Sequence, residues 1–263
     1  MKSETALVHA EVSNHIGVIT LNNPRKRNCL SSALIGEICE TLASMQREEI
    51  RVAILRAPTG SQVFSAGHDI GKLPTNRRDP LTYTDPLRHL VRTIEHFRAP
   101  VIAMVEGTVW GGACELVMSC DMIIAAEDST FAITTTRLGV PYNMSGIQNF
   151  MNSGGMLLCK EMLFTSQPLG ARHLVDRGIV NYAVPREQLE ATTLAIARQI
   201  AQNSPLAISL LKEELRLLSA SHNLSPETFE RVQAMRREVY DSEDYQEGIR
   251  AFHEKRAPIF HGR

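Results

Sequence analysis

Short apolar runs recur through the first 130 residues of the chain. Residues 52–55, 101–105 and 122–126 each hold four or five apolar side chains in a row, which is typical of strands buried on both faces. Residues 6–13 and 16–21 predict two further strands, because the Asn-His pair between them suits a tight turn. Helical spacings follow several of these strands, so a strand–turn–helix plan repeats about every fifty residues. That plan predicts an α/β fold.

From about residue 186 the spacing is almost purely helical. The apolar positions of 205–218 fall on one helical face, and Ser225-Pro226 and Ser242 are typical starts of two further helices. These helices are too few to bury their apolar faces alone, so we expect them to pack on the core or on another subunit. We predict a core that holds the functional site over 1–200 and a helical C-terminal subdomain for assembly over 201–263.

Composition narrows the class of protein. The net charge of the 263 residues is −1, so no strong field draws the chain to nucleic acid or to an anionic membrane. Neither a signal peptide nor a membrane-spanning stretch is present, and the five cysteines show no CxxC spacing. These features predict a cytoplasmic protein with reduced thiols. The sequence carries no signature of a metal, flavin or other redox cofactor.

The stretch F-S-A-G-H-D-I at 64–70 is the first that could carry chemistry. It ends a strand in small residues, which let a ligand approach the backbone closely. Ser65, His68 and Asp69 invite comparison with a nucleophilic triad, but the G-x-S-x-G motif of a nucleophile elbow is missing. The alternative is a tight turn with His68 half-exposed.

The second stretch is glycine-rich and leads into a helix. Residues 107–112 predict a turn, and the backbone N–H groups at the following helix start suit a developing negative charge. Close helix–strand packing is the alternative role for Gly111 and Gly112. Glu115 lies on an otherwise apolar helix, so its carboxylate is either paired in the structure or functional.

A third stretch, at 138–143, contains Gly-Val-Pro-Tyr-Asn and predicts a loop before a helix. Its tyrosine, Tyr142, is either an ordinary half-buried side chain or a hydrogen-bond donor in a pocket. Without further context the two readings stay open.

Four stretches in order resemble motifs of the crotonase (enoyl-CoA hydratase/isomerase) superfamily. They are N-P-R-K-R-N-C-L at 23–30, F-S-A-G-H-D-I at 64–70, G-T-V-W-G-G-A-C-E at 107–115 and S-P-L-A at 204–207. The resemblance implies a spiral of repeated ββα units that assembles as a homotrimer or a dimer of trimers. It also implies an oxyanion hole for a thioester oxygen, made by the N–H groups of His68 and Gly112, which stabilises an enolate.

The side chains indicate which reaction of the superfamily to expect. Hydratases use two glutamates, of which one matches Glu115, but the second would fall at Thr135, where the sequence reads Thr134-Thr135. The stretches 138–143 and 239–248 instead resemble bacterial decarboxylases of malonyl-type thioesters such as methylmalonyl-CoA. The resemblance implies a carbon–carbon lyase that forms propionyl-CoA, with no cofactor besides the coenzyme A of the acyl-CoA substrate.

Decarboxylation needs an electron sink rather than a base, because loss of CO₂ itself generates the carbanion. Under the same resemblance, Trp110 lies in an apolar wall and Tyr142 orients the carboxylate. The proton that reaches the enolate comes from His68, Tyr142, Glu115 or water. The catalytic residues expected are His68, Gly112, Tyr142 and Glu115.

Arg25 and Lys26 lie near the segment that follows the CoA in relatives, and Lys255 matches a C-terminal basic residue that reaches a phosphate in them. For each, a solvated surface cation is the alternative. The residues expected to bind the substrate are Arg25, Lys26, Ala66, Gly67, His68, Asp69, Ile70, Trp110, Gly111, Gly112, Thr134 and Lys255.

Two rival functions follow from the same sequence. Glu115 supports an enoyl-CoA hydratase, isomerase or thioesterase on the same fold, whereas the threonine at 135 argues against it. A non-catalytic scaffold that binds CoA or RNA is the other rival, and the near-neutral charge and intact oxyanion-hole stretches argue against that one.

Overall fold

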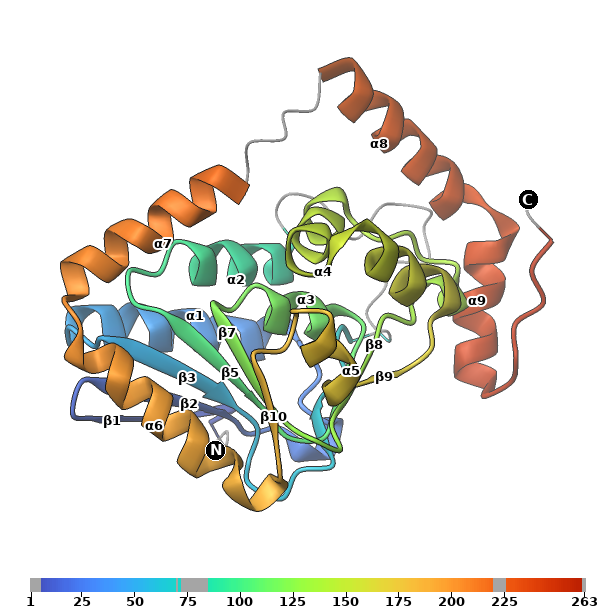
Figure 1. Cartoon of the computed structure of the whole chain (residues 1–263). Coiled ribbons are helices and arrows are strands. Elements are labelled where there is room, and N and C mark those ends of the chain that lie inside the picture. The colour runs from blue at the N-terminus through green and yellow to red at the C-terminus, as the bar shows by residue number, and fades with distance from the viewer. Residues whose placement is uncertain (1–5, 70, 72–84, 220–225, 262–263) are drawn as a thin grey trace, which may run out of the picture.

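The structure is a computed structural model that describes residues 6–69, 71, 85–219 and 226–261. Its centre is a layered α/β core, and helices α7 and α8 extend away from these layers (Figure 1). No helix within the described ranges is both long and apolar enough to cross a membrane.

The larger sheet has six strands in the order β1-β2-β3-β5-β7-β10. The hairpin pair β1 and β2 is antiparallel, and the other neighbours are parallel. Asn14 and His15 both take left-handed φ values, 51° and 63°, which suit the predicted two-residue turn. The strands are β1 (Val8–Ser13), β2 (Ile16–Leu21), β3 (Val52–Arg56), β5 (Val101–Val105), β7 (Met122–Ala126) and β10 (Tyr182–Val184).

Successive residues of the parallel strands alternate between two apolar cores. On β5, Val101, Ala103 and Val105 belong to one core, and Ile102 and Met104 belong to the other. Helices α1 to α5 supply the first core and α6 packs on the opposite face of the sheet (Figure 1). Because both faces are covered, these strands are uninterrupted apolar runs in the sequence.

A second, smaller sheet has the order β4-β6-β8-β9. Each strand β3, β5 and β7 of the large sheet is followed by a short strand of the small one, which gives the repeated strand pairs of the predicted spiral. Two details differ from the sequence-based expectation. The glycine-rich stretch 107–112 contains a strand, and the repeats begin at residues 52, 101 and 122, so their spacing is not constant. The strands are β4 (Val63–Ser65), β6 (Thr108–Trp110), β8 (Thr130–Ala132) and β9 (Leu169–Gly170).

Side-chain caps fix several helix starts. The Ser31 hydroxyl accepts a hydrogen bond from the Leu34 N–H, and the Ser242 hydroxyl accepts one from the Tyr245 N–H. Ser225 lies outside the described residues. The helices are α1 (Ser32–Arg47), α2 (Pro86–Glu95), α3 (Gly112–Met118), α4 (Met144–Thr165), α5 (Ala171–Asp176), α6 (Leu189–Gln202), α7 (Pro205–Ser219), α8 (Pro226–Asp241) and α9 (Glu243–Glu254), with short 3₁₀ turns η1 (Pro24–Lys26), η3 (Thr135–Leu138) and η4 (Arg186–Gln188).

Polar contacts at Lys212 and at the last residue, Ser219, join helix α7 to the rest of the chain. The Lys212 ammonium lies 2.7 Å from the Asp121 carboxylate and donates to the carbonyls of Ile94 and Ala99. The rest of the helix is unlike a core helix, because none of its residues is buried. Its six leucines are 55% to 83% exposed: Leu206, Leu210, Leu211, Leu215, Leu217 and Leu218.

Candidate functional site

A narrow cavity of about 60 Å³ lies where the segment after β4, the start of α3 and the loop between η3 and α4 meet. It gathers predicted residues from three separate stretches of the sequence. The predicted residues that line it are Ala66, His68, Gly111, Gly112, Glu115, Thr134 and Tyr142. Its other lining residues are Asp85, Leu87, Thr135, Leu138, Val140 and Asn143.

The turn after β4 is held by a buried polar side chain from the segment before α1. The Asn28 amide donates to the Phe64 carbonyl at 3.0 Å, and the Ser65 hydroxyl donates to the Asn28 carbonyl at 2.7 Å. Ser65 is fully buried in this contact, so it is a structural residue and no nucleophile. The triad considered from the sequence is therefore wrong.

This turn brings two backbone N–H groups together. Gly67 has a φ of 78°, and a side chain there would lie 2.3 Å from the Trp110 carbonyl, so only glycine fits. A Cβ placed on Gly112 would lie 3.6 Å from the His68 nitrogen. Within the described residues, neither the His68 N–H nor the Gly112 N–H donates a backbone hydrogen bond, whereas the Gly111 N–H donates to the Ala132 carbonyl. Both are thus available to a ligand atom in the cavity.

Glu115 lies on α3 with 2% of its surface exposed. Burial raises the pKa of its carboxyl to about 7, although hydrogen bonds from Asn143 and Tyr142 lower it in part. The Asn143 amide lies 3.1 Å and 3.3 Å from the two carboxylate oxygens. At neutral pH the group is therefore divided between its acid and its anion, unlike an ordinary surface glutamate.

Tyr142 stands beside this carboxyl group. A Cβ placed on Gly146 would lie 2.5 Å from the Tyr142 ring and 2.9 Å from the Glu115 carboxyl carbon, so both side chains converge on that glycine. Burial, and then the nearby Glu115, raise the pKa of the Tyr142 phenol well above its usual value. The phenol therefore stays protonated and can donate a hydrogen bond. Its ring packs on Phe150 with centroids 5.2 Å apart.

The other polar side of the cavity holds His68 and Asp85. The His68 Nε2 lies 3.7 Å from an Asp85 carboxylate oxygen. Burial lowers the pKa of His68, and the carboxylates of Asp85 and Asp69 offset part of that effect. The same Asp85 oxygen accepts hydrogen bonds from the N–H groups of Leu87 and Arg88 at the start of α2, so this carboxylate is a helix cap.

Several predicted binding residues do not line the cavity. Gly67 supports its wall from behind, Trp110 lies half-buried at the end of β6, and Asp69 is half-buried next to His68. Ile70 lies outside the described residues. Three basic residues are exposed and stand apart from the cavity lining: Arg25, Lys26 and Lys255.

Three polar residues at the cavity, Asp85, Thr135 and Asn143, were not among the predicted site residues. Asp85 precedes Pro86, and this pattern of an N-cap followed by proline signals a helix start but no site. Asn143 caps α4 through its amide oxygen while its amide nitrogen holds Glu115. Its second role depends on tertiary contact with α3, which leaves no trace in local sequence. In the described part of the chain, no group of three or more His, Cys, Asp or Glu side chains is placed to hold a metal ion.

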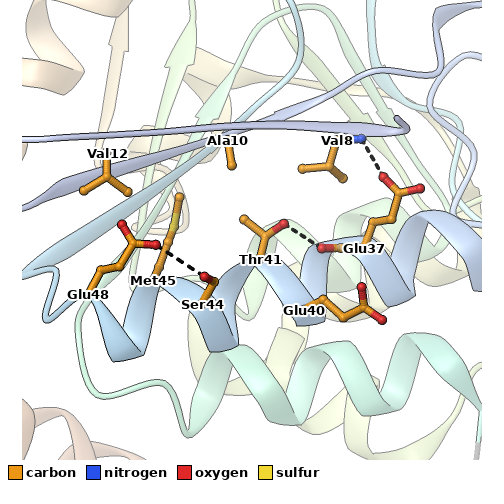
Figure 2. A pocket seen from close by; sticks show the side chains of 9 residues that line it. All are labelled: Val8, Ala10, Val12, Glu37, Glu40, Thr41, Ser44, Met45 and Glu48. Atoms are coloured by element: carbon orange, nitrogen blue, oxygen red, sulfur yellow. Dashed lines mark hydrogen bonds between the residues drawn. The ribbon is translucent and has the colours of Figure 1, made fainter. Parts of the chain in front are cut away.

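A second, larger hollow lies between β1 and α1 (Figure 2). Its floor is apolar, but three glutamates line it, and Glu37 accepts hydrogen bonds from the N–H groups of Leu7 and Val8. Glu37 thereby fastens α1 to the edge strand. Because Glu40 and Glu48 add to the same negative field, this hollow disfavours an anionic ligand such as an acyl-CoA.

Comparison with known proteins gives a consistent result. The family of enoyl-CoA hydratases/isomerases matches residues 11–263. Methylmalonyl-CoA decarboxylase of Escherichia coli (strain K12) is 51% identical over 97% of this chain and 98% of its own. A probable mitochondrial enoyl-CoA hydratase of Dictyostelium discoideum is 33% identical over 96% of this chain and 90% of its own.

Solved structures agree with the sequence relatives. A methylmalonyl-CoA decarboxylase in complex with 2-nitronate-propionyl-CoA superimposes with a TM-score of 0.96. The two chains are 51% identical, and the match covers 98% of this chain and 99% of the other. The spiral architecture predicted from the sequence is thereby confirmed.

Proposed function

Because the chain belongs to the enoyl-CoA hydratase/isomerase (crotonase) family, we propose that it is a carboxy-lyase that converts methylmalonyl-CoA to propionyl-CoA. One observation carries the proposal: two available N–H groups, of His68 and Gly112, meet at a cavity whose carboxyl group, Glu115, has a pKa of about 7. Such a site stabilises an enolate without supplying a strong base. The decarboxylase from Escherichia coli, half identical in sequence, supports the choice of substrate.

The electron flow suits this geometry. The bond between C2 and the carboxylate carbon breaks, CO₂ leaves, and the electron pair moves onto the thioester oxygen as an enolate. The N–H groups of His68 and Gly112 donate hydrogen bonds to that oxygen where its charge develops. A proton then adds to C2, which gives propionyl-CoA.

The side of the cavity beside Glu115 favours loss of the carboxylate. Below about pH 7 the Glu115 carboxyl is mainly neutral and does not repel the anionic substrate. When Glu115 is neutral, the Tyr142 hydroxyl gives up its hydrogen bond to that carboxyl group and donates to the substrate carboxylate, which it orients out of the thioester plane. The apolar neighbours Leu87, Leu138 and Val140 solvate that carboxylate poorly and so favour its conversion to neutral CO₂.

Hydration of an enoyl thioester is the second candidate, and the position of Glu115 at the cavity favours it. Hydratases of the family need a second carboxylate as acid or base, and Thr135 stands where that group would fall. Asp85 is the other carboxylate among the described lining residues, and the cap of α2 engages it. Decarboxylation uses the groups that are present, so it ranks first.

The test is to incubate the purified protein with methylmalonyl-CoA and, separately, with crotonyl-CoA, and to follow both by mass spectrometry. The proposal predicts propionyl-CoA and CO₂ from the first and no reaction of the second. Addition of water to crotonyl-CoA with methylmalonyl-CoA unchanged would overturn it. A chain that binds both thioesters and converts neither would be the scaffold instead.

We also propose how the rest of the substrate is held. Arg25 and Lys26 directly precede the segment that runs beside His68, since the Arg27 carbonyl accepts from the Ala66 N–H. Their charges, with that of Lys255 at the end of α9, suit the phosphates of CoA. The remaining binding residues proposed from the sequence keep that role, Trp110 and Asp69 among them.

We propose a homotrimer, or a dimer of trimers, as the assembled state. The support is the row of exposed leucines on α7, because soluble monomers rarely expose so large an apolar patch. All five cysteines are free thiols, which suits a reducing compartment such as the cytoplasm. We treat residues 1–200 and 201–263 as the core and the assembly subdomain in that proposal.

A further inference from the structure

The C-terminal helix α9 packs against the loop that supplies one wall of the cavity. Two glycines mark where their backbones meet. A Cβ on Gly248 of α9 would lie 2.1 Å from the Leu138 carbonyl oxygen, and a Cβ on Gly139 would lie 2.9 Å from the Asp244 carbonyl oxygen. Side chains other than glycine would therefore separate the two segments at both places.

An apolar cluster completes the contact. Val140, Tyr240, Tyr245 and Ile249 are at most 8% exposed in it, and Leu138 packs against it. The two tyrosine rings meet edge to face with centroids 5.1 Å apart. This cluster is separate from the two cores of the sheet, so the wall residues Leu138 and Val140 depend on α9 for their position.

Helix α9 is itself fixed at both ends. Ser242 caps its start, and the segment after it folds back along the helix. The Glu247 carboxylate pairs with Arg250 and Arg256 and accepts from the Ile259 N–H at 3.1 Å. These bonds tie the segment that follows α9 to the helix.

We propose that α9 sets the width of the acyl pocket, with Gly248 as a positioning residue that acts through Leu138 and Ile249 as one that acts through Val140. The inference rests on the proposed function for the identity of the substrate. It assigns a role to the stretch 239–248, which the chemistry of the cavity leaves unexplained. The ligand selected is a malonyl thioester with a small substituent at C2.

The experiment compares kcat/KM for malonyl-CoA, methylmalonyl-CoA and ethylmalonyl-CoA. Gly248→Ala pushes Leu138 toward the cavity, so we expect the ratio of ethylmalonyl-CoA to malonyl-CoA to fall about 10-fold or more, the scale of one methylene in a tight pocket. Leu138→Ala removes the wall and raises the same ratio. Gly170→Ala is the matched control, because a Cβ there meets nothing within 4 Å, and it leaves the ratio unchanged.

A simple folding defect lowers all three rates together and does not move the ratio. If Gly248→Ala does not fold, Ile249→Val loosens the support behind Val140 and must raise the ratio. Folded variants with the wild-type ratio would overturn the proposal. If the wild type converts none of the three thioesters, the proposed function fails. The role of α9 can then still be tested by binding, as the ratio of the Kd for butyryl-CoA to the Kd for acetyl-CoA in each variant.

Discussion

Helices α3 and α7 differ in which side chains they bury: α3 buries a carboxyl group, and α7 exposes leucines. Helix α3 buries all seven of its residues, and one of them is the carboxyl group of Glu115. Helix α7 buries none of its fifteen residues although six are leucines. A buried acid and an exposed apolar face both cost free energy in an isolated chain, so each indicates a function. On α3 we assign it to a ligand and on α7 to another copy of the chain.

The start of α3 offers the largest expected effect. In Gly112→Ala, the new Cβ lies 2.8 Å from the Leu87 side chain and 3.6 Å from the His68 nitrogen, so it displaces the turn that carries the two N–H donors. We expect kcat/KM for methylmalonyl-CoA to fall ~100- to 1,000-fold, as when an oxyanion-hole donor is lost. Circular dichroism checks that the variant folds, and Gly36→Ala, in open space on α1, is the control. Unimpaired turnover would contradict the role of this turn.

Tyr142→Phe comes second. The change removes the hydroxyl beside Glu115 and keeps the ring that packs on Phe150. If the phenol holds the substrate carboxylate, kcat falls about 10- to 100-fold, the worth of a hydrogen bond to a charged group. Steady-state kinetics measure it, and a change in KM alone would show that the hydroxyl serves ground-state binding only.

Glu115→Gln has a smaller effect on the rate and changes its pH dependence. The pKa of the acid is about 7, so the wild type gains a repelling anion as pH rises through 7. We expect its kcat/KM to fall across that pH, while the glutamine variant has a flat profile and stays within about 10-fold of the wild type at pH 6. A variant that is inactive at every pH would mean that the carboxyl group takes part in the chemistry as acid or base.

The raised pKa of Glu115 also predicts that the free energy of unfolding depends on pH. A carboxyl with a raised folded-state pKa stabilises the fold fully below its unfolded pKa, near 4.5, and that contribution is lost as pH rises toward 7. The loss is about 3 kcal/mol in unfolding free energy, at 1.36 kcal/mol per pKa unit. Denaturant unfolding at pH 5 and pH 8 should therefore show Glu115→Gln gaining on the wild type at the higher pH. If the difference in unfolding free energy between the variant and the wild type is the same at both pH values, Glu115 does not ionise in this range.

The apolar face of α7 gives the smallest expected effect on catalysis. In the double variant Leu210→Asp, Leu215→Asp, two charges disrupt the proposed interface, so the protein should elute from a sizing column as a monomer. None of the described residues that line the cavity lies on α7, so kcat should stay within about twofold. Glu214→Gln on the same helix is the control for altered charge. If the wild-type protein is already monomeric, the exposed leucines of α7 do not form an interface between copies of the chain.

Much of the fold was predictable because local physics decided it. Strands such as 101–105 are buried on both faces, and their apolar runs show it directly. The Ser242 cap lies where the sequence places it. Strand β6 escaped prediction because three residues between glycines pair only with β4 and β8, which the tertiary fold supplies.

Some features of the candidate site were likewise predictable from the sequence, and others were not. The buried position of Glu115 followed from its apolar neighbours, and the nearness of His68 to Gly112 followed from family resemblance alone. Asp85 and Asn143 were missed, since a helix cap in the sequence does not reveal which cavity its side chain borders. The three basic residues were assigned to CoA from family resemblance, and they lie outside the cavity lining.

The central claim is that the cavity stabilises an enolate formed by loss of CO₂, and a competition experiment tests it most directly. Methylmalonyl-CoA and crotonyl-CoA are mixed at equal concentration with the wild-type protein, and both products are followed by mass spectrometry in one reaction. The account predicts that propionyl-CoA accumulates while crotonyl-CoA remains. Accumulation of 3-hydroxybutyryl-CoA with methylmalonyl-CoA untouched would contradict it and would make Glu115 the acid–base group of a hydratase.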